Sequence, residues 1–206
     1  DTGFFHADGG AMFGAIPKTA WSRRYPSDKQ NGCILAMRSM LVRDGNGKIV
    51  LVDNGAGNKH LKQLSYYNFF DLVDLKEELR RRDVACENVT DVILTHLHFD
   101  HCGYTTQKEE QPGEKSLFKM AFPNAIHWVG RAQWENFLHP NALEADSYFI
   151  ENMQAVYDSG KLRLIENDTN LCPGIDLRLF DGHTPGQIAP YITTPERTYV
   201  FAGDVI

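Results

Sequence analysis

The sequence lacks long apolar runs and has no surplus of basic residues. Its longest apolar stretches fall far short of the roughly 20 residues that a membrane helix needs, and its start shows no basic segment followed by an apolar one. The formal net charge is −6, whereas binding to a nucleic-acid backbone depends on clustered Lys and Arg. We therefore expect a soluble chain that binds neither membrane nor nucleic acid, and we favour a cytoplasmic chain over one that has already been processed.

Basic residues are dense only at positions 80–82, where three arginines follow one another. They fall at the end of an expected helix, where cations complement the helix dipole. Glu77 with Arg81 and Glu78 with Arg82 have the i,i+4 spacing of favourable ion pairs. We favour a solvated helix face over a binding patch.

Cysteine is scarce as well. The four cysteines show no Cys-x-x-Cys spacing, and no small secreted scaffold surrounds them, so free thiols are expected rather than disulfides. They are Cys33, Cys86, Cys102 and Cys172. For Cys102 we favour a small packing residue over a nucleophile or a metal ligand.

The composition is that of an ordinary globular protein. Of its 206 residues, 42% are hydrophobic and 23% are charged, which is enough for a substantial core in one domain over residues 1–206.

Metal-capable side chains cluster directly after an apolar stretch at residues 92–94. His96, His98, Asp100 and His101 lie within six positions, and imidazole and carboxylate are ligands that a zinc-type ion prefers. A strand that ends here would aim them from a rigid element into a cavity. Because several imidazoles buried without a shared partner would leave polar groups unsatisfied, the cluster predicts a catalytic metal site.

The pattern His-x-His-x-Asp-His after a strand resembles the signature of the metallo-β-lactamase superfamily. Three further motifs occur in the family's order: Leu-Val-Asp-Asn-Gly at 51–55, Asp-Gly-His-Thr-Pro-Gly at 181–186 and Phe-Ala-Gly-Asp at 201–204. The resemblance implies a four-layer αβ/βα sandwich of the α/β class, with the metals at one edge between the two sheets.

The resemblance also implies a division of the ligands between two zinc ions. His96, His98 and His183 would hold the first ion, Asp100 and His101 the second, and Asp204 would bridge them. Asp100 and Asp204 are then the expected catalytic carboxylates.

Asp53 has two readings. It could orient a metal-bound imidazole, a partner that such histidines usually require, or it could cap a turn.

One departure concerns the second ion. Relatives supply a last histidine shortly after the bridging aspartate, whereas this sequence stops at Ile206. A sequence cut short, a ligand from elsewhere or a mononuclear site would each explain this, and the first is the simplest. The second ion is thus expected to be weak or absent in this chain, and the domain to lack its last elements. The substitute histidines would be His6, His60, His127 and His139, although a strand-like run predicts a structural role for His127.

The elements before the motif are predicted from periodicity and turn residues. Residues 34–43 and 48–52 read as strands joined by the Asp-Gly-Asn-Gly turn at 44–47. A helix is expected from an N-cap at Asp71, with Leu72, Leu75 and Leu79 on one face.

The elements after the motif alternate between loop, helix and strand. Residues 107–116 read as an exposed loop, either a lid or a simple connection. Residues 128–138 become helical, and 147–159 form a helix that Gly160 stops, with Phe149, Met153 and Val156 facing inward. Strands are expected at 162–164, 175–180, 189–192 and 198–202.

The substrate prediction rests on the N-terminal segment. Residues 8–14, with Pro17 and Trp21, resemble the branch that contains N-acyl homoserine lactonases and methyl parathion hydrolase. Two aromatic-rich stretches could wall an apolar pocket: Phe4, Phe5, Phe13 and Trp21, and Tyr66, Tyr67, Phe69 and Phe70. Phe13 and Trp21 are the expected substrate contacts. Core or dimer contacts are the alternative role for most of these aromatics, so a homodimer is kept open beside the small-molecule substrate.

Three functions remain in view. The first is a metal-dependent hydrolase that uses a metal-bridging hydroxide on a lactone or ester such as an N-acyl homoserine lactone. The second is another reaction on the same scaffold, namely thioester hydrolysis of the glyoxalase II kind, phosphotriester hydrolysis or nuclease activity, the last disfavoured by the acidic charge. The third is a metal-binding protein without turnover.

Overall fold

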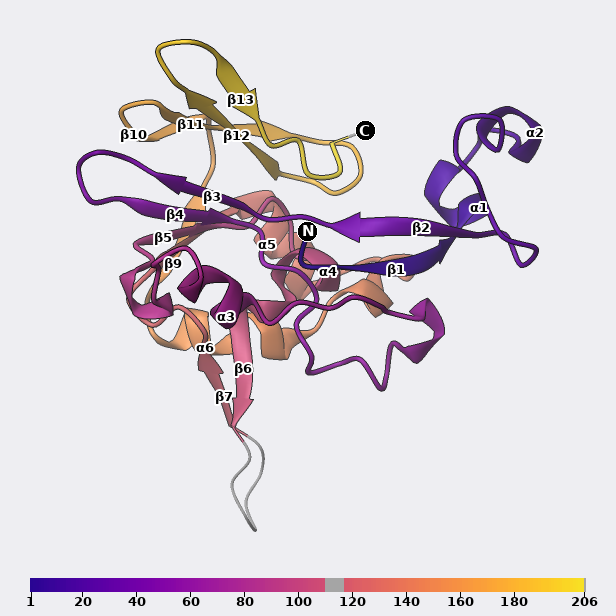
Figure 1. Ribbon diagram of the computed structural model, residues 1–206, viewed down its shortest axis with the longest axis horizontal. Coiled ribbons are helices and arrows are strands. Elements are labelled where there is room, and N and C mark those ends of the chain that lie inside the picture. The colour runs from indigo at the N-terminus through magenta and orange to yellow at the C-terminus, as the bar shows by residue number, and fades with distance from the viewer. Residues whose placement is uncertain (110–116, 206) are drawn as a thin grey trace.

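Two β-sheets lie face to face in the computed structural model, which describes residues 1–109 and 117–205 (Figure 1). The first sheet runs in the order β3 (Met40–Arg43), β4 (Ile49–Val52), β5 (Asp91–Ile93), β8 (Ile126–Gly130) and β9 (Leu162–Ile165). The second runs in the order β10 (Thr169–Cys172), β11 (Ile175–Phe180), β12 (Gln187–Thr193) and β13 (Thr198–Val200). Only the β3–β4 pair is antiparallel in the first sheet, whereas the second is antiparallel throughout.

Alternation along the central strands divides the core into two layers. Val52 and Ile93 face the second sheet and pack against Leu177 and Ile188. Neighbouring side chains point the other way because successive residues of a strand face opposite sides, and Val92 joins the core on the helical side.

Helices cover the outer face of the first sheet. They are α3 (Leu75–Arg80), α5 (Arg131–Leu138) and α6 (Gln154–Asp158). Figure 1 shows no helix over the outer face of the β10–β13 sheet in the described part of the chain. The α/β class and the face-to-face sheets expected from the resemblance are confirmed.

Two antiparallel strand pairs lie outside the two main sheets. One pairs β1 (Gly3–Asp8) with β2 (Gly32–Met37) and carries α1 (Gly9–Phe13) and α2 (Lys18–Trp21) at its far end (Figure 1). The other pairs β6 (Thr106–Glu109) with β7 (Leu117–Met120).

The remaining helical segments are α4 (Phe99–Cys102) and the 3₁₀ turns η1 (Ser65–Tyr67), η2 (Cys86–Asn88), η3 (Gly103–Thr105), η4 (Ala145–Ser147) and η5 (Ile150–Asn152). Over residues 1–109 and 117–205, no helix has the length and apolar character needed to cross a membrane.

Several predicted boundaries are wrong. The strand expected at 34–43 is two strands, because β2 pairs with β1 while β3 pairs with β4. The helix expected from Asp71 starts after Asp74, whose carboxylate accepts from the backbone N–H of Lys76 and caps α3.

The region after the motif also differs. The single helix expected at 147–159 is broken into η5 and α6, although Phe149, Met153 and Val156 are buried as predicted and Gly160 follows with φ 71°. Part of the loop expected at 107–116 is strand β6, whose Gln107 lines a cavity with Lys76 and Cys86 and not with the motif residues. The rest of that loop, 110–116, lies outside the described residues.

The thiols and the basic cluster behave largely as expected. All four cysteines are free. Cys102 is fully buried, and burial raises the pKa of its thiol to about 12. Arg82 pairs with Glu78 as predicted, whereas Arg81 also pairs with Glu78 instead of Glu77.

Candidate metal centre

The His-rich motif lies where β5 ends. Thr95 and His96 are fully buried and His98 nearly so. His98 is the N-cap residue of α4, which places Asp100 and His101 on the first turn of that helix. A short strand followed at once by a helix therefore presents all four side chains at the carboxyl end of a parallel sheet, the usual place for a site in such sheets.

Three imidazoles converge on one point. Nδ1 of His98 lies 3.1 Å from Nε2 of His96 and 3.0 Å from Nε2 of His183. His183 comes from the loop between β11 and β12, far away in the sequence. The ligand atoms of all three lie within 4.8 Å of one another, so the structure brings together the residues that the resemblance assigned to a first ion.

The protonation of these rings fits a cation at that point. Nδ1 of His96 lies 3.1 Å from Oγ1 of Thr95, whose hydroxyl donates to Asp53. This contact assigns the proton of His96 to Nδ1 and leaves a lone pair on Nε2. Burial lowers the pKa of His98 to about 4, so that ring is neutral at pH 7. A single ring proton can bridge only one pair of the three facing nitrogens, whereas a zinc-type ion would satisfy all of them.

A second group adjoins the first and shares His96 with it. The group consists of His96, His101 and Asp204. Oδ2 of Asp204 lies 3.4 Å from Nε2 of His101 and 3.8 Å from Nε2 of His183, so this carboxylate stands between the groups. Oδ2 of Asp100 lies 3.4 Å from the same nitrogen of His101.

Asp53 contacts residues of both groups, His101 directly and His96 through Thr95. Its Oδ1 accepts from the backbone N–H of Thr95 and its Oδ2 from the Thr95 hydroxyl, both at 2.8 Å. Oδ2 also lies 2.8 Å from Nδ1 of His101, which leaves Nε2 of that ring facing Asp100 and Asp204. A carboxylate that fixes the orientation and tautomer of imidazoles is the usual partner of metal-binding histidines. Of the two roles considered for Asp53, these contacts favour orientation of imidazoles.

The carboxylates and His101 form an ionic cluster without a metal ion. Although burial alone would lower the pKa of His101, Asp100 and Asp53 raise it well above its ordinary value. Burial would likewise raise the pKa of Asp100, and the charge of His101 holds it below the usual value. The site is thus a pocket of negative charge that a cation would neutralise.

Gly203 allows the Asp204 loop to approach the motif. Its φ of 55° is in the left-handed region that favours glycine. A Cβ at this position would lie 2.9 Å from Oγ1 of Thr95, so the backbone packs directly on the residue that holds His96.

The comparisons with known proteins agree with this geometry. A model of the metallo-beta-lactamase superfamily matches residues 38–104, which contain the His-rich motif. The crystal structure of a probable metal-dependent hydrolase from Staphylococcus aureus is 30% identical, with a TM-score of 0.86, over 98% of this chain and 70% of that one. The chain belongs to the metallo-β-lactamase superfamily.

Lactonases are among the similar members of the superfamily. The N-acyl homoserine lactonase AiiA from Bacillus thuringiensis subsp. kurstaki is 27% identical over 118 residues, which span 57% of this chain and 38% of the lactonase. The structure of AidC, a dizinc quorum-quenching lactonase, covers 100% of this chain and 69% of that one at 20% identity, with a TM-score of 0.71. The predicted resemblance to the superfamily is confirmed, and lactonases are among the proteins that this chain resembles.

Within the described residues, 1–109 and 117–205, none of the four substitute histidines belongs to either ligand group. The His6 ring packs at a tilt against Phe70, and the His60 ring stacks on Phe149. His127 is buried on β8, in line with its predicted structural role. His139 is exposed at the end of α5.

The two predicted substrate contacts have different positions. Phe13 lines a cavity of about 540 Å³ together with Asp100, His101, His183 and Asp204. Trp21 does not line that cavity. It is buried and stacks on Phe13 at a centroid distance of 4.7 Å, where it supports the Phe13 ring. Its contact with a substrate stays a prediction.

Sequence reasoning missed three other neighbours of the site. Nε2 of Gln187 lies 3.5 Å from Nδ1 of His96. The Tyr148 ring packs 4.9 Å from the ring of His98, and Glu144 accepts a hydrogen bond from the Tyr148 hydroxyl. No local pattern marks these residues. Thr95, by contrast, adjoins the motif and could have been included on that ground.

Proposed function

We propose that this chain is a metal-dependent hydrolase acting on a lactone or another acyl ester. The observation that carries the proposal is the convergence of the imidazole nitrogens of His96, His98 and His183, of which His183 also lines a cavity with apolar walls. A divalent ion bound by these residues would polarise a substrate carbonyl and lower the pKa of water toward 7. No side-chain nucleophile is then required.

The cavity suits a substrate with one polar and one apolar end. The His and Asp side chains lie on one side, and the β1–β2 hairpin with α1 supplies apolar walls. These walls are Phe4, Phe5, Ala11, Met12, Phe13, Ile34, Leu35 and Ala36. An acyl chain could lie against them while its carbonyl faces the imidazoles.

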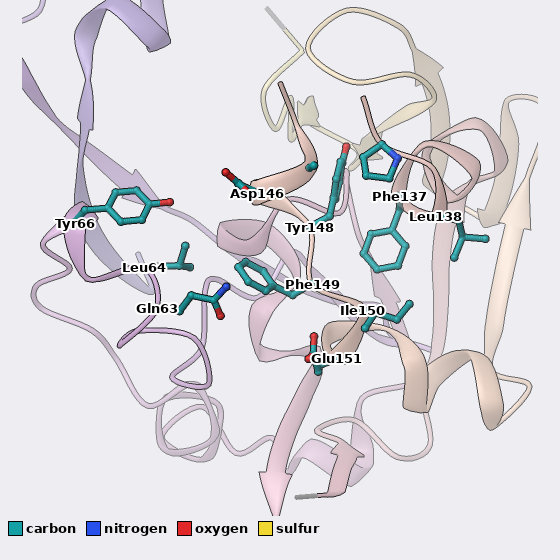
Figure 2. A pocket seen from close by; sticks show the side chains of 12 residues that line it. Gln63, Leu64, Tyr66, Phe137, Leu138, Asp146, Tyr148, Phe149, Ile150 and Glu151 are labelled. Atoms are coloured by element: carbon teal, nitrogen blue, oxygen red, sulfur yellow. The ribbon is translucent and has the colours of Figure 1, made fainter. Parts of the chain in front are cut away.

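A second cavity, of about 730 Å³, is lined by Tyr148 (Figure 2). Gln63, Leu64 and Tyr66 line one side of it, and Phe137 and Leu138 another. Because Tyr148 lines this cavity and also contacts His98, a longer substrate could extend from the centre into it.

Asp100 is the proposed proton carrier. Its carboxylate lines the cavity beside His101, where it can orient a water molecule or accept its proton. Asp100→Asn should keep the fold and lower turnover by about 10²–10⁴-fold, as expected for loss of an acid–base group. Cys102→Ser is the matched control, because the buried thiol contacts Leu97 and Asn152 and lines no part of the cavity. A larger loss in the cysteine variant would favour a thiol nucleophile instead.

We infer zinc as the ion, with two ions in a complete site. Imidazole and carboxylate ligands suit zinc. Among the described residues, the second group consists of His101, Asp204 and the shared His96, and Asp100 adjoins His101. Titration should therefore show one tightly bound ion and one that is lost readily. Two equally tight ions would mean that another residue completes the second group.

The substrate class is tested by comparing lactones, thioesters and phosphotriesters on zinc-loaded protein. The proposal expects the highest kcat/KM for an acyl lactone. A preference for thioesters would indicate thioester hydrolysis of the glyoxalase II kind. A preference for phosphotriesters would indicate a phosphotriesterase. No turnover with full zinc loading would indicate a metal-binding protein.

The remaining assignments are proposals of the same kind. A single domain over residues 1–206, a cytoplasmic location and a small-molecule partner fit the acidic charge and the free cysteines. A homodimer stays a prediction that light scattering of the purified chain would test.

A further inference from the structure

His98 is held differently from the other buried imidazoles of the site. His96 and His101 each have an Nδ1 contact that leads to Asp53, directly or through Thr95. His98 turns its Nδ1 toward the other rings, and its buried Nε2 has no hydrogen-bond partner among the described residues. Its ring orientation must therefore depend on packing.

Tyr148 provides that packing. Its ring centroid lies 4.9 Å from that of His98 with an interplanar angle of 47°. The other side of the phenol meets Phe137 edge to face at 5.6 Å. Tyr148 thus fills the space between His98 and helix α5.

The hydroxyl group of Tyr148 is fixed by three neighbours. It accepts hydrogen bonds from Nε2 of Gln133 at 3.1 Å and Nδ2 of Asn136 at 3.0 Å, and it donates to Oε2 of Glu144 at 3.0 Å. Asn136 also donates to Glu144, and Gln133 is fully buried on α5. A side chain held at its ring and at its hydroxyl has little freedom to turn.

We propose that Tyr148 is a positioning residue that holds the ring of His98 in the orientation needed to bind the metal ion, a role that rests on the proposed function. The network of Glu144, Gln133 and Asn136 anchors α5 and η4 to the centre through this one phenol. The same ring lines the larger cavity (Figure 2), so substrate bound there would touch the residue that positions His98.

Zinc affinity, measured by competition with a chelator, tests this role. Tyr148→Leu should bind zinc about 10-fold to 100-fold more weakly, the range seen when partners of metal-binding side chains are removed. Tyr148→Phe keeps the ring but loses the hydrogen bonds that fix it, so its zinc affinity should still fall, by about 10-fold, the low end of this range. The absorption spectrum of bound cobalt should also change in the leucine variant, because one imidazole is no longer held in place.

Tyr157→Leu is the matched control. Tyr157 also stacks on a residue of α5, Trp134, but it is exposed and contacts no residue of either ligand group. Its zinc affinity and cobalt spectrum should equal those of the parent protein.

The outcomes separate this inference from the proposed function. A folded Tyr148→Leu protein with parental zinc affinity and cobalt spectrum would overturn it. If that variant does not fold, the phenylalanine variant decides, and parental zinc affinity there overturns the inference. A parent protein that binds no zinc would overturn the proposed function and this inference together.

Discussion

The two halves of the candidate metal centre are built in different ways. Thr95, His96 and His98 are buried at the end of β5 and are held by Asp53 and by packing. The side chains of His183 and Asp204 are 34% and 45% exposed and come from loops of the other sheet. The buried half would fix where an ion can lie, and the exposed half would complete its coordination from the second sheet.

Removal of His96 should have the largest effect, because this residue belongs to both ligand groups. His96→Ala should bind neither ion tightly and lose activity by more than the roughly 100-fold typical of supporting residues. His183→Ala should lose the first ion and retain weak binding at the second group. Metal content and chelator competition measure both. Equal loss of both ions in the two variants would contradict the assigned division.

Asp53→Asn should have the next largest effect. Asparagine tolerates the φ of 50° at this position, but its amide cannot accept from Thr95 and His101 as the carboxylate does. Zinc affinity should fall by about 10-fold to 100-fold. Asp44→Asn, which alters a turn carboxylate outside both groups, is the control and should bind zinc normally. Equal affinities in the two variants would mean that Asp53 only caps its turn.

Gly203→Ala should weaken the second ion more than the first. A left-handed φ costs a residue with a Cβ about 1–2 kcal/mol, and that Cβ would press on Thr95. Movement of the Asp204 loop should weaken the second ion by about 10-fold, since 1.4 kcal/mol corresponds to a factor of ten. Gly45→Ala is the control, because a Cβ there meets no atom within 4 Å. If the first ion is lost instead, Asp204 matters more to the first group than we infer.

His127 is a buried core histidine that can be compared with the buried histidines of the site. Burial lowers its pKa to about 4, as it does for His98, yet His127 faces no other imidazole. The folded protein binds this proton less readily than the unfolded chain does, so stability should fall as the pH drops from 6.5 toward 4, by about 3 kcal/mol in total.

His127→Leu should remove this contribution and leave zinc binding unchanged. Denaturant unfolding at pH 7 and pH 4.5 measures the difference, with His139→Leu at the exposed end of α5 as the control. The same acid sensitivity in His127→Leu and in the parent would show that His127 contributes nothing to it.

The difference between the buried and the exposed half also explains which ligands could be predicted from the sequence. The buried half is local: a strand, four ligands and a helix follow one another, so residues 96–101 were identified from spacing alone. His183 and Asp204 were found only through their resemblance to motifs of a known family, because their approach depends on how the two sheets pack.

Other features left no local signal. Strand β1 and the split at residues 38–39 were missed because pairing with β2 is decided by tertiary contacts and not by periodicity. Tyr148 and Glu144 contact the site through the packing of α5, which no spacing in the sequence records.

Anomalous diffraction at the zinc edge from crystals of the zinc-loaded chain tests whether His96, His98 and His183 bind one ion. We expect a peak about 2.0–2.1 Å from Nε2 of His96, Nδ1 of His98 and Nε2 of His183, with Asp204 beside it. A peak coordinated by other residues, or none at full zinc loading, would contradict it.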